Sequence, residues 1–303
     1  MRRIEVGRDF GLSVRMLIVG SILAAIYLTL FAGAVAAAVA IHDRRMWFLP
    51  LLVVLGVLAH YQGADRLALR AMHAREVDPQ QEPDLHEQVA RLSALAEIPK
   101  PAIAVSPLDA PNAFAAGTRP SRATLVVTDG LRARLTPAEL DSVLGHELSH
   151  IANRDAFIVT AASLFPTLGA YLGHWRFGGR DFTHEKRDLR EYIFWPFIMA
   201  MAILLYVFGR LLTFTISRYR EYAADRGSVL LTGAPEQLMS ALQKITGDMA
   251  LIPNRDLRAM SGLNALFIIP AAASRWEVAM DHPPLRKRLA RLEEMARELG
   301  KAI

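Results

Sequence analysis

Long apolar runs alternate with stretches of mixed polarity along this chain. Four runs stand out, at residues 16–41, 47–61, 157–175 and 193–216. Because a helix needs about 20 apolar residues to cross a bilayer, these runs predict about four transmembrane helices. The third run is short, and the basic loop after it would face away from the cytoplasm, against the usual preference of basic loops. This run is therefore predicted either to cross fully or to form a re-entrant hairpin.

The runs divide the chain into four predicted parts. These are an N-terminal membrane anchor at 1–61, the first half of a folded domain at 62–155, a transmembrane hairpin at 156–216, and the second half of the domain at 217–303. Arginines ahead of the first run predict a cytoplasmic N-terminus. With an even number of crossings before each half, the folded domain is predicted to face the cytoplasm as well.

Helical periodicity in the polar parts predicts two amphipathic helices. Residues 84–98 repeat apolar side chains at intervals of three and four, with Leu95 among them. Residues 284–299 predict a basic helix whose leucines, Leu299 included, share one side. Both helices would pack an apolar face against the rest of the folded domain.

Three short segments predict strands. Residues 102–106 and 123–128 are rich in β-branched residues, and the small, apolar residues 112–117 between them suit an edge strand that another chain can approach. The predicted fold class is therefore an α+β membrane protein, mostly helical, with about four transmembrane helices and a small antiparallel sheet.

The bulk composition agrees with that class and narrows the chemistry. The 303 residues are 52% hydrophobic with a mean hydropathy of +0.23, which is high for a soluble protein. There is no cysteine, so a metal site must use His, Asp or Glu. The net charge of +5 fits basic residues beside membrane segments. No nucleic-acid-binding module is recognisable, so nucleic acid is not an expected partner.

One stretch, residues 141–150, contains the pattern H-E-x-x-H. Its fixed positions are His146, Glu147 and His150. Residues four apart share a helix face, so two imidazoles can bind one Zn²⁺ while Glu147 is placed to take a proton from bound water. A capping-box sequence at 136–139 predicts the start of this helix. The plainer alternative is that both histidines are ordinary core or surface residues.

A catalytic zinc needs a third protein ligand. The strongest candidate is Glu221, with Asp225 one turn later placed to hydrogen-bond the far nitrogen of a ligand histidine. Two predicted crossings separate His150 from Glu221, so both would reach the same membrane face. A solvated helix of alternating charges is the alternative for this stretch, and His282 or Asp155 would then be the next candidate ligand.

Several motifs together resemble one family. The matching segments are Asn112–Gly117, His146–Asp155, Ser217–Asp225, Pro235-x-x-Leu followed by Ala241-Leu-x-Lys-Ile, and His282-Pro-Pro. From about residue 62 to the C-terminus, their order and spacing resemble the integral-membrane zinc metalloproteases of the HtpX type, relatives of the CAAX prenyl protease. The chain departs from that pattern at Met280 and Asp281, where the family usually has Ser-Thr before the histidine.

The resemblance implies a zincin-like catalytic domain and a Zn²⁺ cofactor. The zinc ligands that it implies are His146, His150 and Glu221. Glu147 would be the catalytic base, and Asp225 would hydrogen-bond a ligand histidine. Asn112 and His282 match positions near the active site, as possible contacts to substrate or transition state.

The function implied is a multi-pass metalloendopeptidase of the inner (cytoplasmic) membrane. Its substrates would be misfolded or damaged membrane proteins, in stress response and protein quality control, and its other partner is the lipid bilayer. The sequence does not indicate an oligomeric state. One alternative is a narrower processing protease acting on lipidated or short peptides. A second is a non-enzymatic membrane protein with a structural zinc site.

Overall fold

The computed structural model describes residues 68–117, 119–155, 217–251 and 283–301, together with isolated helical positions between 14 and 51 and at 203 and 207. Apart from those isolated positions, the four predicted transmembrane runs lie outside the described residues. Among the residues described, no helix has both the length and the apolar character needed to span a bilayer. The division into anchor, hairpin and two domain halves therefore stays a prediction.

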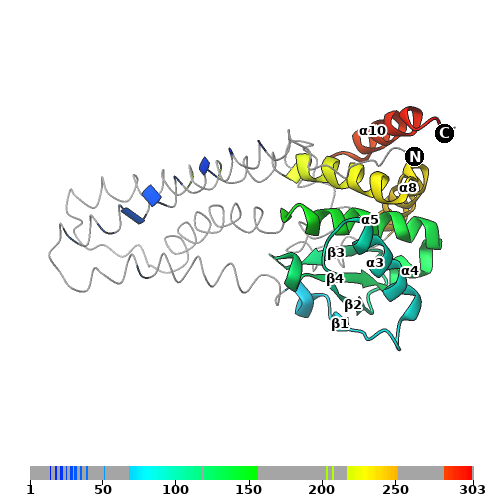
Figure 1. Cartoon of the computed structure of the whole chain (residues 1–303), viewed down its shortest axis with the longest axis horizontal. Coiled ribbons are helices and arrows are strands. Elements are labelled where there is room, and N and C mark those ends of the chain that lie inside the picture. Colours follow the sequence, from blue (N-terminus) through cyan, green and yellow to red (C-terminus); the bar gives the residue numbers. More distant parts are fainter. Residues whose placement is uncertain are drawn as a thin grey trace, which may run out of the picture.

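A four-stranded mixed sheet lies below the green, yellow and red helices in the view of Figure 1. In spatial order its strands are β1 (Arg75–Glu76), β2 (Ala102–Ser106), β4 (Thr124–Thr128) and β3 (Ala113–Ala116). β2 pairs with β4 in parallel, whereas β1–β2 and β3–β4 are antiparallel. The expectation of an antiparallel sheet is therefore wrong for the central pair.

Burial explains this arrangement. Every residue of β4 is buried, and a strand covered on both faces belongs in the interior of a sheet. After β2 the chain forms β3 first, as the outer strand, and returns through the short turn η2 (Pro120–Arg122) to place β4 between them. Having reversed direction twice, the chain enters β4 in the same direction as β2.

β3 lies at the edge of the described sheet, as predicted for residues 112–117. The Thr128 N–H donates to the Asn112 carbonyl at 3.0 Å, which shows which residue pairs of the β3–β4 ladder are hydrogen-bonded. Hydrogen-bonded pairs alternate with non-bonded pairs in an antiparallel ladder. The N–H and C=O groups of Ala113 and Ala115 consequently point away from β4, toward the outer edge of β3.

The helix predicted over 84–98 is present as α3 (Pro83–Leu95). The apolar residues that it buries are Leu85, Val89 and Leu92. Leu95 is 50% exposed, so its assignment to the apolar face is wrong. The helix stops there because Glu97 has a φ of 55°, a left-handed conformation through which an α-helix cannot continue.

The H-E-x-x-H helix is α5 (Pro137–Ala152), and its start confirms the predicted capping box. The Thr136 hydroxyl accepts the N–H of Glu139, whose carboxylate accepts the N–H of Thr136. The same carboxylate accepts hydrogen bonds from Ser240 and Lys244 of α8 (Pro235–Leu251). Burial raises the pKa of Glu139, but these hydrogen bonds outweigh it and lower the pKa to about 2. One ionised side chain therefore both begins α5 and holds α8 against it.

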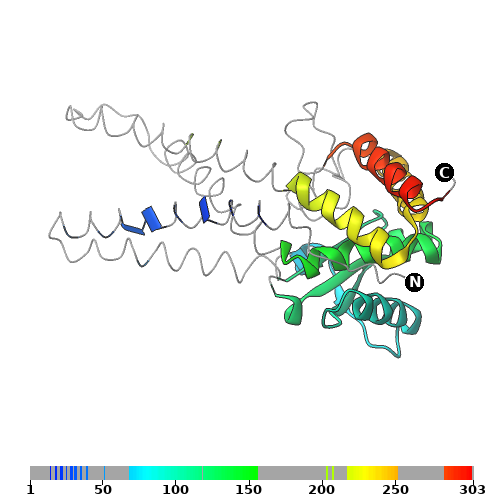
Figure 2. The ribbon, with the colours of Figure 1, turned by 45° about the horizontal axis from the view of Figure 1, so that its top comes forward.

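The helices form layers over the sheet (Figures 1 and 2). α5 packs between β3 and α8, with α3 also against it, and α10 (Leu285–Glu298) packs on α8. The helical residues 217–232 precede α8. Residues 142–149 of α5 are all buried, so this helix lies in the middle of the core and is not limited to a single buried stripe.

α10 confirms the helix predicted over 284–299, and the predicted leucines Leu285, Leu289 and Leu292 pack into the core. The buried residues are Arg288, Leu292 and Ala296, spaced four apart. Leu299 is 44% exposed at the end of the helix, so its assignment to the apolar side is wrong. The arginine at the first of these buried positions has a partner in the site described below.

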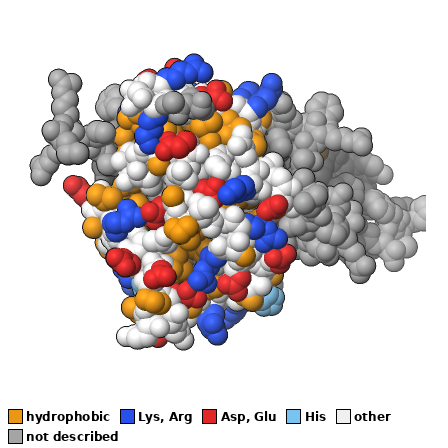
Figure 3. Space-filling view, turned by 90° about the vertical axis from the view of Figure 1, so that its right-hand side faces the viewer, with side chains coloured by type: hydrophobic (Ala, Val, Ile, Leu, Met, Phe, Trp, Pro, Cys, Tyr) orange, Lys and Arg blue, Asp and Glu red, His pale blue; other side chains and the backbone are white. Residues whose placement is uncertain are grey.

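Ion pairs join the outer elements of the domain. Arg132, at the end of α4 (Asp129–Arg134), pairs with Glu82 ahead of α3, and Arg134 pairs with Asp109. The face shown in Figure 3 carries acidic and basic side chains interspersed among apolar ones. Exposed pairs contribute only about 0–1 kcal/mol each, so packing of the core around α5 contributes more to holding the domain together.

Candidate metal centre

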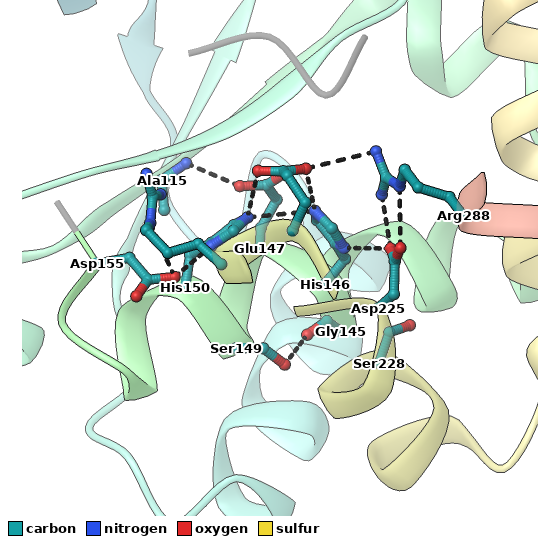
Figure 4. Close-up of polar contacts among 12 residues, drawn as sticks. Ala115, Gly145, His146, Glu147, Ser149, His150, Asp155, Asp225, Ser228 and Arg288 are labelled. Carbon is teal, nitrogen blue, oxygen red and sulfur yellow. Dashed lines mark hydrogen bonds and ion pairs between the residues drawn. The ribbon is translucent and has the colours of Figure 1, made fainter. Parts of the chain in front are cut away.

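Three side chains from two helices converge on one point (Figure 4). His146 and His150 are four apart on α5, which brings their Nε2 atoms to 3.2 Å. Glu221, on the helical segment 217–232, lies across from them. Its Oε2 is 3.5 Å from His146 Nε2, and its Oε1 is 3.6 Å from His150 Nε2. Two imidazoles and a carboxylate gathered in this way can hold a metal ion.

The site is almost closed to solvent. The side chains of His146 and Glu221 are 1% and 3% exposed, and that of His150 is 11% exposed. Burial lowers the pKa of His146, but hydrogen bonds to the Asp225 and Glu221 carboxylates raise it to about 9. The surroundings of this imidazole therefore favour a positive charge, and a metal cation bound in place of the proton supplies one.

An aspartate stands behind each histidine. Asp225 Oδ1 lies 3.0 Å from His146 Nδ1, and Asp155 Oδ2 lies 2.6 Å from His150 Nδ1. A carboxylate on Nδ1 holds the ring proton there and leaves the Nε2 lone pair for a metal. The position of Asp225 is the one predicted from sequence, whereas Asp155 was considered only as an alternative ligand.

Glu147 lies beside the two histidines and next to the edge strand β3. Its Oε2 accepts a hydrogen bond from the Ala115 N–H at 3.1 Å, one of the groups that point away from β4. Burial raises the pKa of Glu147 above its usual value, although the neighbouring histidines act in the opposite direction. A carboxylate with a raised pKa is better matched to accepting a proton near neutral pH.

Two further residues, Asn112 and His282, were predicted from sequence as contacts to substrate or transition state. Asn112 is buried at the start of β3, where its backbone N–H and C=O both bond the Thr128 hydroxyl. His282 lies outside the described residues. Their contacts to substrate or transition state stay predictions.

Sequence reasoning missed two arginines at this site. Arg288 of α10 contacts Asp225 and Glu221, and Arg220 contacts Asp155. Arg288 falls on the same four-residue spacing as Leu292 and Ala296 of α10. An arginine in register with buried apolar positions was a signal that it would have a buried acidic partner.

Small residues let the two site-bearing helices approach closely. A Cβ built on Gly227 would lie 2.2 Å from the Ser149 hydroxyl and 2.7 Å from its Cβ, so only glycine fits there. One residue further, the Ser228 hydroxyl donates to the Ser142 carbonyl of α5. These contacts set the distance between α5 and residues 217–232, and hence between the histidines and Glu221.

Gly227→Ala is accordingly expected to weaken metal binding by pushing Glu221 away from α5. Ser149→Gly in the same chain removes both atoms that the new methyl group would meet, so the double variant should regain most of the lost affinity. Gly247→Ala is the matched control, because nothing lies within 4 Å of a Cβ at that position in α8. Titration with Zn²⁺ measures all three, and unchanged affinity in Gly227→Ala would contradict this role.

An H-E-x-x-H helix buried beside an edge strand, with a glutamate supplied by a second helix, defines a metallopeptidase. The sequence profile of peptidase family M48 matches residues 79–296, and the chain belongs to this family. It is a metalloprotease, and the resemblance predicted from the motifs is confirmed.

Relatives extend over nearly the whole chain. The chain is 44% identical to "Protease HtpX homolog" of Moorella thermoacetica, with 99% of each chain covered, and 41% identical to "Protease HtpX homolog 1" of Streptomyces coelicolor, with 90% of each covered. Its fold is similar to the crystal structure of S. mikatae Ste24p, with a TM-score of 0.50 at 19% identity. That match covers 93% of this chain but 65% of Ste24p, so this chain spans less than two thirds of that protein.

Proposed function

We propose that this chain is a membrane-anchored zinc endopeptidase whose ion is held by His146, His150 and Glu221. The observation that carries the proposal is the convergence of these three side chains, whose ligand atoms lie within 4.8 Å of one another. Tetrahedral zinc with bonds of about 2.0–2.2 Å places its ligand atoms roughly 3.3–3.6 Å apart. Here the two Nε2 atoms are 3.2 Å apart, and each has a different Glu221 oxygen near this distance, at 3.5 Å from His146 and 3.6 Å from His150. Three protein ligands also leave the fourth position that a catalytic zinc needs.

The protein groups around this site have distinct tasks. A bound Zn²⁺ would supply a coordinated water of lowered pKa and polarise the scissile carbonyl. Glu147 accepts the proton of the attacking water on its carboxylate and then delivers it to the nitrogen of the leaving amine. Asp225 and Asp155 hold the Nδ1 protons of His146 and His150, which keeps both Nε2 atoms directed at the ion.

The outer edge of β3 is the proposed place for substrate. The outward N–H and C=O groups of Ala113 and Ala115 can pair with an extended peptide, which would add a strand to the sheet. The Ala115 N–H contacts Glu147. A peptide on this edge would therefore lie within one residue of the catalytic base.

The proposed substrates are misfolded or damaged membrane proteins, cleaved at the cytoplasmic face of the inner membrane. The similarity to HtpX homologues over the full chain and the four apolar runs of the sequence support this assignment. A narrower protease for lipidated or short peptides is the second candidate, and the likeness of fold to Ste24p is the observation that favours it.

A metal and cleavage assay tests the activity. The purified full-length chain is expected to hold about one zinc and to cleave an unfolded protein such as casein. A chelator should abolish cleavage, and added Zn²⁺ should restore it. Cleavage that persists at full rate after the zinc has been removed would overturn the proposal.

Reporter fusions test the orientation. A reporter after Ile303 and one at the N-terminus should both report from the cytoplasm, because an even number of crossings separates them. A reporter inserted at Asp43, between the first two runs, should lie on the opposite side. A C-terminal reporter found outside the cell would show that the predicted number of crossings is wrong.

A further inference from the structure

Behind His146, the chain of contacts extends one residue beyond the aspartate. Arg288 donates from Nε to Asp225 Oδ2 at 2.9 Å and from Nη2 to Asp225 Oδ1 at 2.6 Å. That same Oδ1 lies 3.0 Å from His146 Nδ1. The guanidinium therefore grips the aspartate with two parallel hydrogen bonds, and the aspartate in turn faces the histidine (Figure 4).

Behind His150, a second arginine makes a single contact with the aspartate. Arg220 Nε lies 3.2 Å from Asp155 Oδ2, the oxygen that is 2.6 Å from His150 Nδ1. The two arginines come from different places in the chain. Arg220 directly precedes the proposed ligand Glu221, whereas Arg288 comes from the C-terminal helix α10.

The burial of Arg288 distinguishes it from a surface ion pair. Its side chain is 2% exposed, and its Nη1 also lies 3.4 Å from Glu221 Oε2. Burying a guanidinium is costly unless its partners are well oriented and charged. Asp225 and Glu221 supply those charges, and Asp225 accepts hydrogen bonds from two guanidinium nitrogens, one on each of its oxygens.

We propose that Arg288 is a positioning residue of the metal centre, acting through Asp225 on the ligand histidine His146. The proposal rests on the zinc ligands proposed above. An arginine that makes two hydrogen bonds to a carboxylate fixes its plane. The single ammonium of lysine does not. The fixed carboxylate keeps the ring proton on Nδ1 and the Nε2 lone pair on the ion.

The charge of Arg288 and its positioning role predict opposite changes in zinc affinity when the arginine is removed. A positive arginine beside a cation site repels the cation, so its removal would tighten zinc binding if charge were all that changed. Loss of positioning predicts weaker binding, by about 10- to 100-fold for groups that orient a metal ligand. The direction of the change in affinity therefore separates the two roles.

The first measurement is the Kd for Zn²⁺ of the full-length chain in detergent, by competition with a chromogenic chelator. Arg288→Met is expected to bind zinc about 10- to 100-fold more weakly. Arg288→Lys keeps the positive charge, so it is expected to fold even if Arg288→Met does not. Its loss of zinc affinity should be intermediate. The matched control is Arg291→Met, because Arg291 also anchors α10, stacked 4.0 Å over the Tyr222 ring, without touching the site. This variant should keep the wild-type affinity.

The second measurement shows whether Arg288 acts through Asp225. Asp225→Asn should weaken zinc binding. Adding Arg288→Met should weaken it little further, because the contact between Asp225 and His146 through which Arg288 acts is already disturbed. In Arg288→Met combined with Asp155→Asn, the two fold-losses of zinc affinity should multiply, since these residues lie behind different histidines.

The possible outcomes separate this inference from the proposed function. The positioning role would be overturned if zinc affinity were unchanged or tighter in both Arg288 variants. It would also be overturned if the losses of Arg288→Met and Asp225→Asn multiplied fully in the double variant. A wild-type chain that binds no zinc would overturn the ligand set itself, and with it the proposed function.

Discussion

Replacing Glu147 with glutamine is expected to remove most proteolysis while leaving the metal in place. Glutamine has nearly the same shape and can still accept the Ala115 N–H through its amide oxygen, but it cannot take a proton from water. Positioned proton-transfer groups contribute about 10²- to 10⁴-fold to rates. Cleavage should therefore fall at least about a hundredfold, while zinc per chain, measured by atomic emission, should match the wild type.

A second glutamate on the same helix provides the control. Glu139 is also buried on α5, but it binds Ser240 and Lys244 and lies outside the metal centre. Glu139→Gln should lower the temperature of unfolding and leave the rate per folded molecule unchanged. If Glu147→Gln loses its zinc, Glu147 is a ligand; if it keeps more than a tenth of the activity, another group is the base.

Removing the Glu221 carboxylate is expected to have the opposite signature, with zinc and activity lost together. Glu221→Ala deletes the oxygens that lie 3.5 and 3.6 Å from the two Nε2 atoms and leaves the buried Arg288 facing a gap. Zinc affinity should fall by more than about a hundredfold, the upper range for groups that only orient a ligand. Glu221→Gln keeps the shape without the charge, so excess zinc should restore part of its activity.

Metal content and cleavage rate, measured for both Glu221 variants under one set of conditions, test this assignment. Retention of full zinc affinity by Glu221→Ala would place the third ligand elsewhere. Asp155 already faces His150 Nδ1, the nitrogen away from the centre, so His282 would then be the residue to change next. Zinc retained in Glu221→Gln but lost in Glu147→Gln would reverse the two roles.

Much of the candidate metal centre could be predicted because its signals are local or short. The H-E-x-x-H spacing and the capping box depend only on helix geometry, and α5 has both. Glu221 and Asp225 were found because they too are separated by one helical turn. Sequence alone could not place Asp155, which approaches His150 from beyond the end of α5 at a corner where Arg154 has a φ of 57°.

The sheet shows the opposite case. β2, β3 and β4 were predicted from their own residues, whereas the two-residue β1 was not. The order β1-β2-β4-β3 depends on which strand is buried on both faces within the assembled domain. Arg288 was missed for a related reason. Its buried partner Asp225 lies 63 residues away, and only the docking of α10 brings the two together.

The metal centre is assembled from stretches of chain that are synthesised at different times. The histidine helix is made first, the segment with Glu221 follows after 156–216, and Arg288 is the last of these residues to be added. Chains fold from the N-terminal side as they leave the ribosome. A growing chain therefore carries the histidines before it carries the carboxylate and arginine that complete the site. The candidate site can therefore be complete only after residue 288 has been added, well after both histidines have left the ribosome.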